Sequence, residues 1–207
     1  MPVNVVSEVA QNAREIVPRT FWVVSAILRQ ELDWRAKGLP RHIAINVSAR
    51  LLQDAGFVRE MNNLLASSAG YFHFEFEITE TALMSSQERA IYPAGELLNT
   101  GGTLAIDDFG TGYSSLAYLK GLQASVLKID RSFISQLGSP GESRAIVETI
   151  LNLASSLGIG VVAEGIETAD QVDRLRQMQC PHGQGFWFSR PLTPTAAEEL
   201  IASAPTG

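Results

Sequence analysis

The sequence predicts an α/β fold in which parallel strands alternate with covering helices. Short apolar segments rich in β-branched and aromatic residues recur along the chain, and turn residues bound each of them. Segments with helical periodicity separate them, so each strand is followed by a crossover and is expected to run parallel to the next. No linker rich in Pro, Gly and Ser interrupts the 207 residues, which predicts a single domain over residues 1–207.

Six strands are expected, each apolar and bounded by turn residues. In chain order they are His42–Val47, Phe72–Ile78, Thr103–Asp107, Val126–Asp130, Gly160–Ala163 and Gly185–Phe188. A closed (β/α)8 barrel needs eight strands and typically about 250 residues, whereas an open doubly wound sheet accommodates six. No Gly-x-Gly-x-x-Gly turn follows any of these strands. The pattern alone therefore leaves two architectures open, a doubly wound sheet and a barrel without its beginning.

Helices are expected between and after the strands. They cover Arg14–Lys37, Ala49–Ser67, Glu88–Asn99, Ser114–Lys120, Ser143–Leu157, Ala169–Met178 and Thr195–Ala202. Ser48 and Thr168 directly precede two of them and are residue types that cap helix N-termini. Gly38, Gly101 and Gly158 close three others, because glycine readily adopts the left-handed conformation that ends a helix.

Composition and charge exclude several classes of protein. A net charge of −6 argues against a broad basic face that binds duplex nucleic acid. Cys180 is the only cysteine, so no intrachain disulfide can form, which is typical of a reducing cytoplasm. The most apolar stretch, Phe21 to Leu28, is too short to cross a bilayer, and no signal peptide follows Met1. We therefore expect a cytoplasmic domain, although the cytoplasmic part of a membrane-anchored protein would have the same composition.

Acids and amides stand where the predicted strands end, which is where barrels and doubly wound sheets place their active sites. These residues are Asn46, Glu77, Asp107, Asp108 and Glu164. Carboxylates that converge at one end of a sheet repel each other, and a divalent cation relieves that repulsion. Because the set offers only oxygen ligands, it suits Mg2+, Mn2+ or Ca2+ better than zinc.

Lys128 lies within an apolar strand, where burial on both faces of the sheet requires anionic partners. Two cations about 3.5–4 Å apart would activate water and stabilise an in-line displacement at phosphorus. The lysine would then orient the attacking water or neutralise charge on the phosphate. The arrangement predicts phosphodiester hydrolysis.

Each of these residues also has an ordinary explanation when it is considered alone. Asn46 before Ser48 is typical of a turn or a cap, and paired Asp107 and Asp108 are common where a strand enters a loop. Lys128 by itself resembles a side chain that reaches solvent. The recurrence of such residues at successive strand ends favours the catalytic interpretation over these separate ones.

Six motifs follow one another along the chain in a fixed order. They are Asn-Val-Ser-Ala-Arg at 46–50, Glu-Ile-Thr-Glu at 77–80, Asp-Asp-Phe-Gly-Thr-Gly-Tyr-Ser-Ser at 107–115, Leu-Lys-Ile-Asp-Arg-Ser-Phe at 127–133, Val-Ala-Glu-Gly-Ile-Glu-Thr at 162–168 and Gln-Gly-Phe-Trp-Phe-Ser-Arg-Pro-Leu at 184–192. Together they resemble the signatures of the EAL domain family, roughly from Val6 to the C-terminus. The resemblance implies a TIM-like (β/α)8 barrel that hydrolyses cyclic-di-GMP to the linear dinucleotide pGpG with Mg2+ or Mn2+.

The resemblance also implies roles for individual residues. The implied metal ligands are Asn46, Glu77, Asp107 and Glu164, with Asp108 at the second metal. Lys128 would assist the attacking water, so Lys128, Asp107 and Glu164 form the implied catalytic set. Glu80 would hold the loop that follows Asp108, which is also linked to dimerisation in the family.

Four further residues complete the expected site. Asp130, Glu167 and Gln184 are implied to support the metal ligands, and Gln184 is also expected to contact substrate. Arg190, just past the last predicted strand, is our own candidate for a phosphate or base contact.

One family motif, Glu-x-Leu-x-Arg, has no counterpart in this sequence. It precedes the helix that corresponds to Arg14–Lys37, so we expect an N-terminally truncated barrel with about six of its strands. The unpaired edges of such a sheet are expected to be covered by a rearranged N-terminus or by another chain, such as the second copy in a homodimer. Sensory or GGDEF domains are expected companions in the native protein.

Two main functions are compatible with these features. The first is a cyclic-di-GMP phosphodiesterase whose activity is impaired by the missing motif. The alternative is a catalytically inactive cyclic-di-GMP receptor or regulatory protein-interaction module. A metal-dependent phosphatase on an unrelated α/β sheet is a third possibility, which the ordered motifs disfavour.

Overall fold

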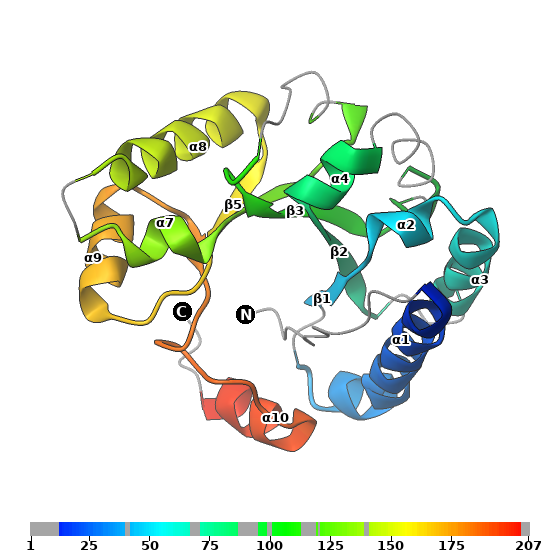
Figure 1. Ribbon diagram of the computed structural model, residues 1–207. Coiled ribbons are helices and arrows are strands. Elements are labelled where there is room, and N and C mark those ends of the chain that lie inside the picture. The colour runs from blue at the N-terminus through cyan, green and yellow to red at the C-terminus, as the bar shows by residue number, and fades with distance from the viewer. Residues whose placement is uncertain are drawn as a thin grey trace.

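The computed structural model describes residues 13–39, 42–66, 71–86, 95–98, 101–112, 119, 121–138 and 141–203. Its sheet contains β1 (His42–Asn46), β2 (His73–Thr79), β3 (Thr103–Phe109), β4 (Val126–Ile129), β5 (Gly160–Ala163) and β6 (His182–Gly183). The strands lie in the order β1-β2-β3-β4-β5-β6, and every neighbouring pair is parallel. A doubly wound sheet reverses its strand order at a switch point, so this unbroken order identifies a barrel-type sheet. Figure 1 shows the sheet curled into part of a barrel.

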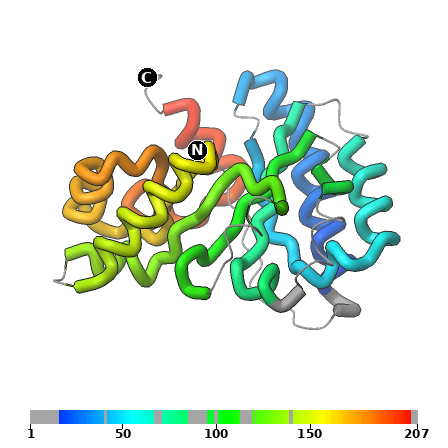
Figure 2. Tube along the Cα trace, turned by 90° about the horizontal axis from the view of Figure 1, so that it is seen from above, coloured from blue at the N-terminus to red at the C-terminus, as the bar shows by residue number. Residues whose placement is uncertain are grey.

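Helices form the outer layer of the molecule (Figure 1). In the described part of the chain they include α1 (Ala13–Ala36), α2 (Ala49–Leu52), α3 (Ala55–Ala66), α4 (Glu80–Ser86), α7 (Arg131–Ser135), α8 (Ser143–Leu157), α9 (Ala169–Gln177) and α10 (Pro194–Ser203). Seen from above, the blue and teal helices α1 and α3 lie at one end and the yellow and orange helices α8 and α9 at the other (Figure 2). None of the helices in the described ranges is long and apolar enough to cross a membrane.

Local capping explains where several helices begin and end. Ser48 accepts a hydrogen bond from the backbone N–H of Arg50 at the start of α2. Thr168 and Gln171 form a capping box at the start of α9. Gly158, with a φ of 69°, ends α8 in the left-handed conformation. These three boundaries confirm the start and stop signals that the sequence contains.

The predicted strand at Gly185–Phe188 is wrong, because the sixth strand is His182–Gly183 and the later segment forms a turn. The Trp187 N–H donates to the carbonyl of Ile166 at 2.9 Å, and the Phe188 N–H donates to the carbonyl of Gly185 at 3.0 Å. Gly185 has a φ of 155°, and a Cβ there would lie 2.2 Å from the Ile166 carbonyl oxygen. The close backbone approach at Gly185 therefore ends the strand and turns the chain.

Two other differences concern helices. The single helix expected at Ala49–Ser67 is divided into α2 and α3, because the Asp54 carboxylate accepts from the N–H groups of Gly56 and Phe57 and starts a new helix. The short helices α4 and α7, which begin directly where β2 and β4 end, were not expected. The helices expected at Glu88–Asn99 and Ser114–Lys120 lie mostly outside the described residues, of which 95–98 and 119 are helical.

The two faces of the sheet have different chemistry. In β2, Phe74, Phe76 and Ile78 are buried on one face and contribute to the hydrophobic core beneath the helices. Glu75 and Glu77 alternate with them and point to the inner, concave face. Because the outer face is buried in apolar contacts, a one-residue slip would bury these carboxylates in the core, and the register is therefore strongly fixed.

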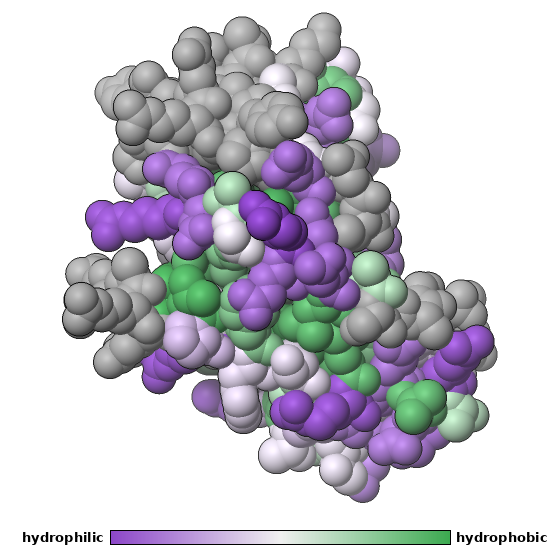
Figure 3. All heavy atoms as spheres, turned by 90° about the vertical axis from the view of Figure 1, so that its right-hand side faces the viewer, coloured by the Kyte–Doolittle hydropathy of each residue, from purple (hydrophilic) through white to green (hydrophobic). Residues whose placement is uncertain are grey.

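A polar contact joins the first and last described helices. Glu198 of α10 accepts a hydrogen bond from the Trp34 indole N–H of α1 at 2.9 Å, and it also forms an ion pair with Lys37. The helix layer is thereby linked between α10 and α1, although β1 and β6 are the edge strands of the sheet. On the side of the molecule that carries α1 and α3, hydrophilic and hydrophobic residues are intermixed (Figure 3).

Candidate metal centre

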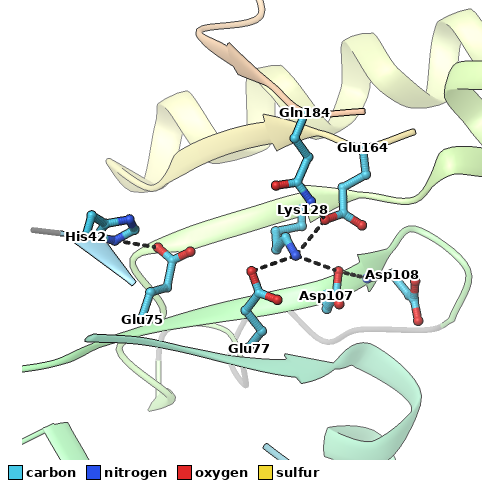
Figure 4. A network of polar contacts seen from close by, with 8 residues as sticks. All are labelled: His42, Glu75, Glu77, Asp107, Asp108, Lys128, Glu164 and Gln184. Atoms are coloured by element: carbon cyan, nitrogen blue, oxygen red, sulfur yellow. Dashed lines mark hydrogen bonds and ion pairs between the residues drawn. The ribbon is translucent and has the colours of Figure 1, made fainter. Parts of the chain in front are cut away.

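A buried lysine surrounded by carboxylates lies on the inner face of the sheet (Figure 4). The Lys128 Nζ atom is 2.7 Å from Glu77 Oε1, 2.6 Å from Glu164 Oε1 and 3.4 Å from Asp107 Oδ1. These four residues come from β4, β2, the end of β5 and β3, and strand alternation turns each of them inward. The structure thus brings together the four residues for which the sequence predicted the central chemistry.

Lys128 is 2% exposed, and its three ammonium hydrogens match its three carboxylate neighbours in number. Burial alone would lower the pKa of this lysine. The negative charges of Glu164, Glu77 and Asp107 outweigh that effect and hold the pKa above its usual value. Lys128 is therefore a permanent cation inside the sheet.

Glu77 is 2% exposed and only partly satisfied. One of its carboxylate oxygens pairs with Lys128, whereas the other, Oε2, is buried and has no hydrogen-bond partner among the described residues. Burial raises the pKa of Glu77, and the lysine opposes that rise. A buried acceptor oxygen without a donor carries a desolvation cost, and a cation at the inner face would satisfy it.

Glu164 follows β5 and is oriented by a side chain from the next segment. The Gln184 amide donates a hydrogen bond to Glu164 Oε1, the same oxygen that contacts Lys128. Burial raises the pKa of Glu164 to about 8, with Lys128 acting to lower it and the Asp107 charge acting to raise it further. This carboxyl group therefore binds a proton readily and releases it when a cation takes the place of the proton.

Asp107 and Asp108 face the same region although they are consecutive residues of β3, and successive residues of a regular strand point to opposite faces. The register with β4 shifts between Ile106 and Phe109, and Asp108 has a φ of 53°. This bulge turns both carboxyl groups to the same side, and the Asp108 N–H donates to Asp107 Oδ1 at 3.0 Å.

The bulge creates a converging set of oxygens. Single carboxylate oxygens of Asp107, Asp108 and Glu164 lie within 4.8 Å of one another, a spacing that one cation can bridge. Burial and the nearby charges of Asp107 and Asp130 raise the pKa of Asp108 to about 6. Oxygen-only donors of this kind suit Mg2+, Mn2+ or Ca2+, so the residues present fit a divalent metal ion.

Glu80, at the start of α4, anchors the loop after Asp108. It is 1% exposed, and its Oε2 accepts from the backbone N–H groups of Gly110 at 2.8 Å and Gly112 at 3.2 Å. The expectation that Glu80 holds this loop thus has a direct structural counterpart.

The other expected site residues lie at different distances from the carboxylates. Asn46 ends β1 and pairs in register with Glu77, so it stands beside the cluster on the neighbouring strand. Asp130 caps α7 by accepting from Ser132, and hydrogen bonds from Ser132 outweigh burial and lower its pKa.

Two residues stand apart from the cluster. Glu167 is exposed before α9, where its N–H donates to the Gln171 side chain. The Arg190 guanidinium is exposed and lies 4.9 Å from the centre of the Phe186 ring. Within the described ranges, the ion pairs of the cluster involve neither Glu167 nor Arg190.

Sequence reasoning missed a second polar group deeper on the inner face. Glu75 is buried, and one of its oxygens lies 3.5 Å from His42 Nε2 (Figure 4). The His42 ring stacks on His73 with centroids 5.3 Å apart, and His73 contacts the Thr103 hydroxyl at 3.1 Å. The signal was the Glu-x-Glu alternation of β2, which places Glu75 on the same face as Glu77.

The chain is similar to proteins of one family throughout most of its length. The EAL domain model matches residues 2–191. The bifunctional diguanylate cyclase/cyclic di-GMP phosphodiesterase MucR of Pseudomonas aeruginosa is 40% identical over 196 residues, which cover 94% of this chain and 28% of MucR. The chain spans 26% to 32% of the length of three such curated relatives.

Solved structures of the family have the same fold. The c-di-GMP complex of the MucR phosphodiesterase from P. aeruginosa has a TM-score of 0.80 at 38% identity and covers 88% of this chain and 80% of that one. The manganese/cy-diGMP complex of Klebsiella pneumoniae BlrP1 has a TM-score of 0.73 at 27% identity and covers 86% of this chain and 44% of that one. The curled parallel sheet, the carboxylate cluster and the match over residues 2–191 lead to one conclusion. The chain belongs to the EAL domain family.

Proposed function

We propose that this chain hydrolyses cyclic-di-GMP to pGpG with two divalent cations, Mg2+ or Mn2+. The observation that carries the proposal is the group of carboxylates around the buried Lys128, together with the converging oxygens of Asp107, Asp108 and Glu164. Family membership supports the substrate, because MucR is named a cyclic di-GMP phosphodiesterase. The manganese complex of BlrP1 supports the choice of metal.

Within this proposal, metal ligands come from the three strands β1, β2 and β3 and from the residue that follows β5. They are Asn46, Glu77, Asp107, Asp108 and Glu164. Bound divalent cations would supply an activated water and an electrostatic clamp on the phosphodiester. Lys128 faces the same space and would orient that water or offset charge that develops on the phosphate. Gln184 would hold the Glu164 carboxylate through its hydrogen bond, and Asp130 would act on Asp108 from nearby, since its charge helps to raise the pKa of Asp108.

The proposed substrate contacts lie in the turn after β6. Gln184 precedes a run of exposed aromatic residues, in which Phe186 is 52% and Trp187 49% exposed. Arg190, stacked on Phe186, offers a cation for a phosphate, and exposed rings offer faces on which bases stack. We expect Arg190→Ala to raise the KM for cyclic-di-GMP by roughly tenfold, the loss of one charged contact. The matched surface change Arg144→Ala should leave the KM unaltered.

The test of the activity is direct. Purified protein is incubated with cyclic-di-GMP and Mg2+ or Mn2+, and pGpG is followed by chromatography. Glu164→Gln should abolish product formation, whereas the exposed control Glu148→Gln should not. Tight binding of cyclic-di-GMP without product would instead establish a receptor, and the absence of both binding and product would refute both functions.

The proposal extends to the setting of the domain. We place this single domain in the cytoplasm, with sensory or GGDEF domains as companions in the native protein. A second copy of the chain, or another chain, would cover the outer edges of β1 and β6, beside which no further strand lies among the described residues. Light scattering after size exclusion measures this directly, and a monomer at all concentrations would contradict the homodimer.

A further inference from the structure

Lys128 occupies the place where a positive charge is most needed in the metal-free protein. Its ammonium group lies within 2.7 Å of oxygens on two different strand ends, those of Glu77 and Glu164. Lys128 and Glu77 are each 2% exposed, so the charge of Glu77 depends on the ammonium rather than on water for its compensation. The ammonium therefore holds together carboxylates that would otherwise repel each other.

The carboxylates that bind the lysine are also candidate ligands of the metal. Asp107 and Glu164 belong both to the Lys128 ion pairs and to the set of oxygens within 4.8 Å of one another. Glu164 Oε1 already receives hydrogen bonds from Lys128 and from Gln184. A metal ion that binds there must therefore interact with carboxylates whose negative charge Lys128 already compensates.

We propose that Lys128 is a built-in counter-ion, which keeps the site assembled without metal and weakens the binding of a divalent cation. The cation and the ammonium compete for Asp107 and Glu164, so metal binding requires Lys128 to give up part of its contacts. The buried Glu77 Oε2 has no hydrogen-bond partner among the described residues, so the ammonium does not satisfy every carboxylate oxygen of the cluster. The inference rests on the proposed metal site but requires no phosphodiesterase activity.

Removal of the ammonium should change two properties in opposite directions. Lys128→Met leaves the buried Glu77 and the partly buried Asp107 and Glu164 without their cation, so the metal-free protein becomes less stable. The same variant presents more uncompensated negative charge to a metal ion, so its affinity for Mn2+ rises by about tenfold or more. A merely structural lysine would lower stability without strengthening metal binding.

The experiment measures Mn2+ binding by calorimetry and thermal unfolding with and without Mn2+, in the absence of any nucleotide. Lys128→Met and Lys128→Gln should both show a tighter Kd and a larger Mn2+-induced rise in Tm than the unsubstituted protein. Lys128→Arg, which keeps the charge, should restore weaker binding. Lys37→Met, at an exposed lysine, is the matched control and should change neither quantity.

Each outcome of this experiment either supports or overturns the proposed role of Lys128. An unchanged or weaker Kd in both neutral variants overturns the proposal. So does a failure of both variants to fold at saturating Mn2+, because the metal should replace the ammonium. Folding that occurs only with Mn2+ supports it. Tight Mn2+ binding by the variants, without pGpG formation by the unsubstituted protein, would uphold this inference while refuting the proposed hydrolysis.

Discussion

Replacement of Glu80 by glutamine isolates the contribution of one buried charge to the loop beside the metal centre. The carboxylate is 1% exposed and accepts two backbone hydrogen bonds, from Gly110 and Gly112. A hydrogen bond to a charged group contributes about 1.5–3 kcal/mol, and a neutral one about 1 kcal/mol. Glutamine keeps one acceptor but adds a buried amide donor. We therefore expect a loss of about 2–3 kcal/mol, which for a chain of this size lowers Tm by roughly 5–10 °C.

Chemical denaturation and thermal unfolding of Glu80→Gln measure this loss. The exposed change Glu148→Gln, at a surface ion pair, should stay within about 0.5 kcal/mol. Because the loop directly follows Asp108, the buried substitution should also weaken Mn2+ binding, and the surface substitution should not. A Glu80→Gln protein as stable as the parent, with unchanged Mn2+ affinity, would show that the two glycine contacts do not stabilise the loop.

Three other predictions concern the site and the turn after β6. The raised pKa values of Glu164, about 8, and Asp108, about 6, mean that Mn2+ must displace protons, so affinity rises with pH between about 6 and 8. Calorimetry in buffers of different ionisation enthalpy detects the released protons, and a pH-independent Kd would contradict this. In the metal-free protein the raised pKa of Glu164 has the opposite effect, because the contribution of this group to the free energy of unfolding is fully present below pH 4.5 and is lost as pH rises through about 8. Gly185→Ala should destabilise the fold by about 3 kcal/mol, because its Cβ would lie 2.2 Å from a carbonyl oxygen, whereas Gly141→Ala meets no atom within 4 Å and should be neutral in urea unfolding.

Strand periodicity explains how much of the site could be predicted. A period of two turns Glu77 and Lys128 to the same face, and parallel strands carry their ends to one edge, so their proximity follows from the sequence. The common orientation of Asp107 and Asp108 does not follow from this periodicity. It depends on a bulge that interrupts the alternation of side chains along β3.

The turn after β6 shows a different limit. Aromatic residues favour strands, so Phe186 and its neighbours were expected in one. What overrides this preference is the contact of Gly185 with the backbone of Ile166, which belongs to another segment of the chain. Local pattern carries no information about such a contact. Glu75 illustrates the opposite case, because the Glu-x-Glu alternation of β2 determines its face but nothing local in the sequence indicates its partner His42.

The unbroken strand order has a consequence for how the molecule folds. Each strand pairs in parallel with the next one along the chain, so every step of sheet growth must first close a crossover, as between His42 and His73, and folding is expected to be slow. The contact between Trp34 and Glu198 spans 164 residues and can form only when the last helix is in place. Loosening that contact should therefore accelerate unfolding while leaving the folding rate almost unchanged. Amide exchange should be slowest at the centre of the sheet, in β2 to β4, and fastest at the two-residue strand β6.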